Sequence, residues 1–304
     1  MRYRPFGGGG SVVSSVSLRL HPAPDLTRSG VVGLIHGALE QGINYFELPG
    51  GEAEILDAVG EALRPVDRNL LVVSLRVGGA PGGPTSSGRD FGPQTLANQI
   101  VDAQRRTGLR QFDAAVLDDP AAEELSPKAL ETLKIARSTN RVRTLGVSGV
   151  DEAIEAYIST GAFDMLVIPF NLASGWRERR RLVEAQRRDM VIVGYDFWPE
   201  SFRRGEARPT RNGLLDRLGG KPRNEPLAGA GTYAFLDNTP NWTSEQICMA
   251  YALSDVSVAT IMVDTTSVEH LQALAEVADR ELPSAVSAQV EMARFSVEKL
   301  EAAG

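Results

Sequence analysis

Short apolar runs alternate with helix-like segments along most of this chain, and that alternation limits its fold more than any other feature. Eight runs are interpreted as strands, at 16–20, 43–48, 69–77, 112–118, 142–149, 163–171, 190–197 and 258–264. Most are continuously apolar, which is typical of parallel strands buried on both faces. Helical patterns fill the gaps, at 29–41, 52–63, 93–108, 126–139, 150–160, 176–188, 243–253 and 267–278.

Eight strand–helix units favour an α/β fold of the (β/α)8 type, a TIM barrel, over a doubly wound sheet. A doubly wound sheet usually has a glycine-rich fingerprint after its first strand, and none follows Leu20. A length of 304 residues is ordinary for a barrel that forms one domain. We therefore predict a single barrel domain over residues 1–304.

Four segments fall outside the repeating unit. Residues 1–14 are expected to form an N-terminal hairpin that closes the bottom of the barrel, and 284–300 an extra C-terminal helix. Residues 79–92 form a loop rich in Gly, Pro and Ser, and 198–242 a long arginine-rich loop after the seventh strand. Loops of such length in compact domains are usually functional or mobile, so the second is interpreted as a lid or a docking face.

The overall charge and the cysteine count exclude several classes of protein. A net charge of -7 argues against a nucleic-acid or anionic-membrane partner, so a small-molecule substrate is expected. The single cysteine, Cys248, allows no internal disulfide, and the start MRYRPFGGGGS lacks the apolar core of a signal peptide. We expect a cytoplasmic protein, and leave open whether it forms a homo-oligomer.

Polar residues stand where most of the predicted strands end. In (β/α)8 barrels the active site lies at the carboxyl ends of the strands. The residues at or just after these ends are His21, Glu47, Arg76, Asp118, Ser148, Asn171, Asp196 and Asp264. Carboxylates next to a guanidinium suit acid–base chemistry. No metal is expected, because Arg76 would stand among the ligands.

Several segments resemble those of aldo-keto reductases. ALEQGINYFEL (38–48), VRTLGVSG (142–149), VIPFNL (167–172) and SVEHLQALAE (267–276) are similar to family segments and occur in the same order. The N-terminal MRYRPFG also fits the opening hairpin of that family. The resemblance spans nearly the whole chain, and it implies a (β/α)8 barrel that reduces carbonyl groups with NADPH.

The same resemblance places other residues at the family's catalytic positions. Its Asp, Tyr, Lys and His fall on Glu47, Glu52, Arg76 and Asp118. A glutamate that is ionised at neutral pH cannot donate a proton as the family's tyrosine does. An arginine stays protonated and does not replace a lysine at a site that depends on a tuned pKa. The resemblance therefore implies that the usual route of carbonyl reduction is closed to this chain.

The cofactor positions implied by the resemblance are also altered. They fall on Gly149, on Val167, on Asp196-Phe197-Trp198 and on Asp264-Thr265-Thr266. An aspartate beside a phosphate repels it, and the loss of an arginine removes a bidentate partner. Ser148 and Asn171 survive. We expect no cofactor, and NADPH held by Ser148 and Asn171 is the alternative.

Each candidate at the mouth also has a structural interpretation. Glu47 and Arg76 could form a buried ion pair without any chemistry. Glu52 could simply complement the dipole of the helix that it begins. One of Asp118 and Asp119 is expected to start the turn at Pro120, and the other to point into the mouth. A lone loop histidine such as His21 is more often structural, although histidine is the residue type best suited to proton transfer near neutral pH.

Three functions follow, in order of preference. The first is a non-redox acid/base enzyme (a cyclase, a lyase or dehydratase, or an isomerase) for a bulky, largely apolar molecule of bacterial secondary metabolism. Glu52 or Asp118 would act as the acid/base, and the Glu47–Arg76 pair would orient that side chain, with His21 nearby. The expected substrate-binding residues are Phe91, Phe170, Asn171, Trp176, Asp196 and Trp198. The second is a divergent NADPH-dependent aldo/keto oxidoreductase, and the third a catalytically silent binding or regulatory homologue.

Overall fold

Eight parallel strands close into a barrel in the computed structural model, in the order β10-β3-β4-β5-β6-β7-β8-β9. The structure describes residues 1–79, 88–199, 202, 233 and 235–301. The barrel strands are β3 (Val16–Arg19), β4 (Tyr45–Pro49), β5 (Val72–Val77), β6 (Phe112–Leu117), β7 (Val142–Ser148), β8 (Met165–Pro169), β9 (Val191–Tyr195) and β10 (Val258–Asp264). The predicted (β/α)8 barrel is confirmed, with each strand inside or within one residue of its predicted run.

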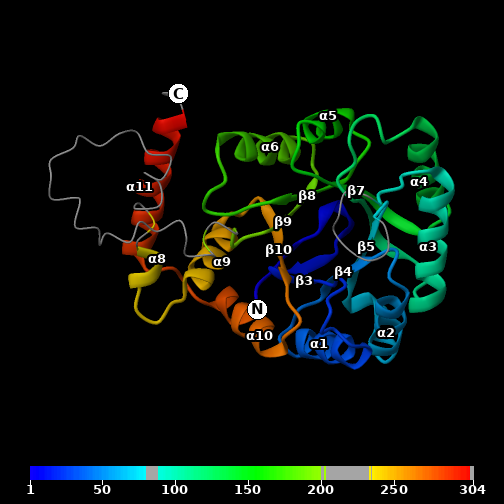
Figure 1. The fold of residues 1–304 in the computed structure, drawn as a ribbon, viewed down its shortest axis with the longest axis horizontal. Coiled ribbons are helices and arrows are strands. Elements are labelled where there is room, and N and C mark those ends of the chain that lie inside the picture. Colours follow the sequence, from blue (N-terminus) through cyan, green and yellow to red (C-terminus); the bar gives the residue numbers. More distant parts are fainter. Residues whose placement is uncertain (80–87, 200–201, 203–232, 234, 302–304) are drawn as a thin grey trace.

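Helices surround the barrel (Figure 1). They are α1 (Arg28–Glu40), α2 (Ala53–Leu63), α3 (Pro93–Thr107), α4 (Pro127–Ser138), α5 (Ala153–Thr160), α6 (Trp176–Arg187), α8 (Phe235–Asn238), α9 (Ser244–Ser254), α10 (Val268–Ala275) and α11 (Ser284–Glu301). Short 3-10 turns cover Gly7–Gly9, Arg68–Leu70 and Glu276–Asp279. The predicted C-terminal helix is present as α11. Most of the loop 198–242 and part of the loop 79–92 lie outside the described residues.

Helix starts follow the local sequence. The Ser126 side chain caps α4 by accepting from the Ala129 amide, and Pro127 occupies the first turn, where its missing N–H costs nothing. Thr243 and Gln246 form a reciprocal capping box at the start of α9. Both starts agree with the sequence prediction. Among the described helices, none combines the length and the apolar character that a membrane crossing requires.

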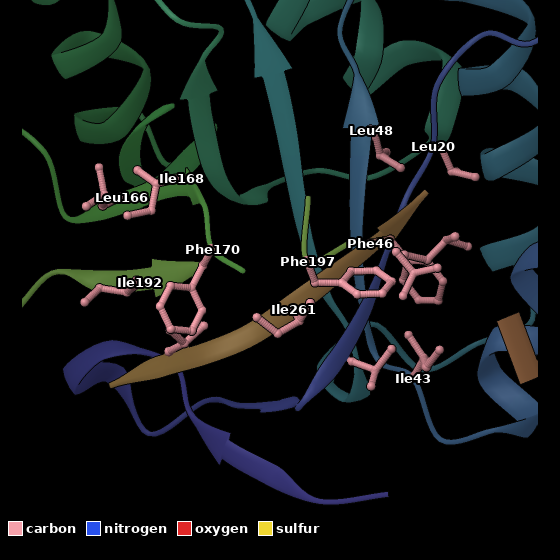
Figure 2. Packing of buried hydrophobic residues seen from close by; sticks show 14 of the residues in the cluster. Leu20, Ile43, Phe46, Leu48, Leu166, Ile168, Phe170, Ile192, Phe197 and Ile261 are labelled. Atoms are coloured by element: carbon pink, nitrogen blue, oxygen red, sulfur yellow. The ribbon is translucent and has the colours of Figure 1, made fainter. Parts of the chain in front are cut away.

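Alternate residues of each strand face different layers of the core. Phe46 and Leu48 of β4 point outward into the layer beneath the helices, where Leu20, Ile168 and Ile261 also lie (Figure 2). The intervening residues point into the barrel. There Tyr45 contacts Phe6 edge to face, with ring centroids 5.5 Å apart.

An antiparallel hairpin of β1 (Tyr3–Pro5) and β2 (Val12–Ser14) precedes the barrel. Two of its side chains, Phe6 and Val13, join the core cluster inside the barrel. The hairpin therefore fills the bottom of the barrel with apolar side chains, as the sequence predicted. Any opening to the barrel interior is left at the carboxyl ends of the strands.

Candidate active site

The inward face of each strand continues to the mouth of the barrel. On β4 the inward residues are Tyr45 and then Glu47, and on β5 they are Ser74 and then Arg76. Register brings these strand ends together, because Arg19 of β3 pairs with Glu47, and Asp264 of β10 pairs with Arg19. Charged side chains from several strands therefore meet at one edge, where barrels of this type bind ligands.

One cluster joins Glu47, Arg76 and Asp118. The Arg76 Nε donates to Glu47 Oε1 over 2.9 Å, and Nη1 donates to Asp118 Oδ1 over 2.5 Å. The Glu47 side chain is 1% exposed, Arg76 19% and Asp118 25%. Burial alone would lower the pKa of Arg76, but the two carboxylates outweigh it and raise that pKa. Arg76 is therefore a fixed cation held between two anions.

A second cluster joins Arg19, Asp264 and Tyr195. The Arg19 Nε donates to Asp264 Oδ1 over 2.6 Å, and Nη2 donates to Asp264 Oδ2. The guanidinium carbon lies 4.9 Å from the centre of the Tyr195 ring. Burial, opposed by Arg76 and Arg19, raises the pKa of Tyr195 to about 12. The phenol is therefore neutral at physiological pH and can donate a proton.

A third contact distinguishes the two adjacent aspartates. Arg89 Nη2 lies 3.1 Å from Asp119 Oδ2, and Nη1 donates to the Asp119 carbonyl over 2.7 Å. Asp119 has a φ of 53°, and its amide donates to Ser148 Oγ over 3.1 Å. Asp119 therefore holds the turn together, while the neighbouring carboxylate of Asp118 turns to Arg76.

These clusters line a cavity of about 510 Å³. All the acid/base candidates predicted from the sequence reach it, because the cavity wall includes His21, Glu47, Glu52, Arg76 and Asp118. Glu52 is the N-cap residue of α2, and its side chain makes no capping hydrogen bond. The His21 Nδ1 lies 4.0 Å from Asp264 Oδ1, and its side chain is 44% exposed. The structure thus brings these five residues to one cavity.

The expected substrate-binding residues do not line this cavity. The expected residues absent from the wall are Phe91, Phe170, Asn171, Trp176, Asp196 and Trp198. Phe170 is 1% exposed and stacks on Tyr251, with ring centroids 6.0 Å apart, because it follows the inward Pro169 and faces outward. Phe91 is buried against Gly78. Trp176 is 51% exposed at the start of α6.

The cavity wall is instead charged, and the sequence reasoning missed three of its charged or polar groups, Arg19, Arg89 and Tyr195. Arg89 lies on a loop, whereas Arg19 and Tyr195 are at strand ends, two residues before His21 and one residue before Asp196. The missed signal is the two-residue period of the strands. Counting back along β3 from the outward Leu20 places Arg19 inside, and counting from the inward Val193 on β9 places Tyr195 inside.

The two surviving cofactor candidates are occupied by internal contacts. Ser148 Oγ accepts from the Asp119 amide and donates to the Leu117 carbonyl, both over 3.1 Å. Asn171 Nδ2 donates to the Asp196 carbonyl over 3.0 Å, and its Oδ1 accepts from the Ala173 amide over 2.8 Å. Both residues are buried. The internal contacts fix both side chains in place and use part of their hydrogen-bonding capacity.

Two further positions that the resemblance assigns to the cofactor are Gly149 and the end of β10. A Cβ on Gly149 would lie 2.9 Å from Asp119 Oδ1, so a side chain there requires the Asp119 carboxylate to shift. At the end of β10 stands the carboxylate of Asp264, held by Arg19. The described wall therefore places a carboxylate, Asp264, at one of the positions that the resemblance assigns to the cofactor. The described residues also contain no group of three or more His, Cys, Asp and Glu placed to hold a metal ion.

Comparisons with solved structures place the fold among known enzymes. An aldo-keto reductase from Bacillus halodurans in its holo form is 16% identical, with a TM-score of 0.74 over 97% of this chain and 96% of that one. A glycerol dehydrogenase from Gluconobacter oxydans is 19% identical, with a TM-score of 0.71 over 96% and 94%. An aldo-keto reductase from Klebsiella pneumoniae in complex with NADPH is 16% identical, with a TM-score of 0.67 over 97% and 96%.

Identities this low show that the fold is shared, and they do not establish that the activity is shared. A search of curated proteins gives no match for this chain. The model of the aldo/keto reductase family, however, matches residues 24–294. That span covers nearly the whole barrel, so the chain belongs to the aldo/keto reductase family.

Proposed function

We propose that this chain is an acid–base enzyme that acts on a small molecule in the barrel mouth without a nicotinamide cofactor. The observation that carries the proposal is the Glu47–Arg76–Asp118 cluster, which faces the same cavity as the neutral phenol of Tyr195. A carboxylate and an un-ionised phenol on one cavity supply a base and an acid. Isomerisation, elimination and cyclisation can all use both without a co-reactant, and of these we propose isomerisation.

Asp118 suits the role of the base. Its Oδ1 is held by Arg76, so the carboxylate is fixed in orientation, while 25% of the side chain stays accessible. Its Oδ2 lies beside Gly79, where a Cβ would approach it to 3.1 Å. Glycine therefore leaves space next to this oxygen. A C–H proton next to a carbonyl group could pass to Asp118 at this point.

Tyr195 suits the role of the acid. Its phenol can protonate a carbonyl oxygen as the base removes the carbon-bound proton, which yields an enol. Asp118 then gives the carbon-bound proton to the former carbonyl carbon, while a hydroxyl group on the first carbon returns a proton to Tyr195 and becomes the new carbonyl group, so the isomerisation balances in atoms and charge. Arg76 and Arg19, which favour the ionised phenol, would stabilise the phenolate formed between the two steps.

The family and its solved members favour a second candidate, carbonyl reduction with NADPH. The Klebsiella pneumoniae neighbour is in complex with NADPH. In this chain Glu52 stands where the resemblance implies the family's proton donor, so Tyr195 would have to supply the proton instead. We rank this candidate second because Ser148 and Asn171 make internal hydrogen bonds and Asp264 places a carboxylate at an implied cofactor position. A place in bacterial secondary metabolism and a cytoplasmic location remain predictions.

Two measurements separate the candidates. The first is a titration of the full chain with NADPH, followed by tryptophan fluorescence. We expect no saturable change at millimolar cofactor, and saturation with turnover of any aldehyde or ketone would establish the second candidate.

The second measurement is deuterium exchange. A panel of small hydroxy- and aminocarbonyl compounds in deuterated buffer is followed by proton NMR, and we expect loss of a C–H signal that depends on the protein. The exchange should be lost in Asp118→Asn and in Tyr195→Phe. Absence of both exchange and NADPH binding would leave the silent homologue as the remaining hypothesis.

A further inference from the structure

One carboxylate oxygen at the mouth lacks a hydrogen-bond partner. Glu47 is 1% exposed, and Arg76 Nε and Nη2 both approach its Oε1, at 2.9 and 2.8 Å. The other oxygen, Oε2, is buried and accepts no hydrogen bond within the described part of the chain. An unsatisfied buried acceptor is unfavourable. Since Glu47 lines the mouth cavity, a ligand that reaches this oxygen through a small shift of the surrounding side chains would supply the missing hydrogen bond.

Arg76 carries a buried donor that is also not fully hydrogen-bonded. Its Nη2 is buried and makes no well-aligned hydrogen bond within the described residues, although it lies 2.8 Å from Glu47 Oε1. A donor and an acceptor therefore stand side by side at the inner end of the cavity. A ligand that satisfies both must carry a hydrogen-bond donor next to a hydrogen-bond acceptor.

The charge of the wall indicates the sign of that ligand. Arg19–Asp264 and Arg89–Asp119 are one-to-one pairs, whereas Arg76 is shared by Glu47 and Asp118. The three clusters together leave one carboxylate in excess. A partly buried negative charge without a counterion is unfavourable, and a cationic ligand would offset it. An anion would add to the excess, and an apolar group would satisfy neither the donor nor the acceptor.

We infer that the mouth binds a small molecule with a protonated amine next to a hydroxyl or carbonyl oxygen. The ammonium donates to Glu47 Oε2, and the oxygen accepts from Arg76 Nη2. This inference rests on the proposed function, because it names the substrate class of the same mouth. It also replaces the largely apolar ligand that the predicted aromatic residues suggested with a polar, positively charged one.

Calorimetric titration of the full chain with three matched probes tests the inference. The probes are trans-2-aminocyclohexanol, trans-1,2-cyclohexanediol and 2-hydroxycyclohexanecarboxylate, at constant ionic strength. We expect the amine to bind at least about tenfold more tightly than the diol, a difference of about 1.4 kcal/mol. The carboxylate should bind less tightly than the diol. Ethanolamine and ethylene glycol repeat the comparison for a smaller ligand.

Variants locate the preference. Asp118→Asn removes the excess charge but keeps the Glu47–Arg76 pair. The amine should then bind at most about threefold more tightly than the diol, which is a loss of roughly 0.7 kcal/mol of preference. Glu47→Gln should lower it as well. Asp102→Asn makes the same charge change on α3, where the carboxylate pairs with Arg105 and Arg106, and should leave the preference unchanged.

Several results would overturn the inference. They are equal binding of amine and diol, a preference that survives in both Glu47→Gln and Asp118→Asn, and no saturable binding of either amine. The outcome is separable from that of the proposed function. Amine binding without deuterium exchange would refute the acid–base role alone, while exchange on neutral compounds without an amine preference would refute only the ligand class.

Discussion

Replacing Arg76 with methionine should destabilise the fold by about 3–5 kcal/mol, the usual cost of removing one partner from a buried ion pair. Glu47 is 1% exposed, and Arg76 supplies both of its contacts, at 2.9 and 2.8 Å. Methionine fills a similar volume but leaves that carboxylate buried and unpaired. Asp118, at 25% exposed, can be hydrated in the variant, so most of the loss comes from Glu47.

Two further variants assign the loss to the unpaired charge. Glu47→Leu combined with Arg76→Met removes both buried charges, and the cost should return to within about 1–2 kcal/mol of the wild type, because apolar replacements of a buried pair are often nearly neutral. Arg19→Met is the matched control at the same mouth. Arg19 and Asp264 are 20% and 33% exposed, so water can replace the arginine and the cost should be about 1 kcal/mol or less.

Urea unfolding followed by circular dichroism gives the free energies, with the slope compared between variants. Two results would refute the reasoning. One is an Arg76→Met cost no larger than that of Arg19→Met. The other is a double-variant cost equal to the sum of the two single costs, which would mean that Glu47 and Arg76 are not energetically coupled.

Three other predictions concern the mouth and the helices. The pKa of Tyr195 in the folded protein is raised to about 12. Its contribution to stability is therefore present below pH ~10 and is lost as the pH rises towards ~12. Tyr195→Phe should reduce this alkaline loss of stability by up to about 2 kcal/mol, measured from urea midpoints across this pH window. Gly60→Ala should destabilise by about 1–3 kcal/mol, because its Cβ would lie 2.5 Å from the Arg106 carbonyl, whereas Gly33→Ala, with nothing within 4 Å, should stabilise by about 0.5–1 kcal/mol. Thr243→Ala should cost about 1 kcal/mol through loss of the capping box at α9, and an unchanged melting temperature would contradict this.

The barrel was predictable from the sequence because each strand is marked by the residues of its own segment. Mostly apolar runs such as 112–118 and 258–264 are long enough to mark buried strands, and the side chains of Ser126 and Thr243 mark helix starts. Residues 69–71 of a predicted strand instead form or flank a 3-10 turn. The Asp67 side chain caps that turn by accepting from the Asn69 amide, a contact that an apolar pattern does not reveal.

The mouth was only partly predictable. Glu47, Arg76 and Asp118 could be proposed together because adjacent parallel strands end at the same edge. Their sharing of one guanidinium could not, since it depends on the side-chain geometry at the strand ends. Phe170 shows the opposite error, because an aromatic residue at a strand end suggested a pocket wall, whereas strand parity turns it outward against Tyr251.

Arginine–carboxylate pairing explains how one barrel could serve a different chemistry from its structural neighbours. Each guanidinium of the described mouth, on Arg19, Arg76 and Arg89, is already matched to a carboxylate. A phosphate entering there would have to displace a carboxylate from its partner, and the displaced carboxylate would then repel it. A ligand amine meets the reverse situation, because the excess carboxylate attracts it and no arginine–carboxylate pair has to separate. The ligand preference of the mouth is therefore set by how these inward side chains pair, while the barrel that positions them stays the same.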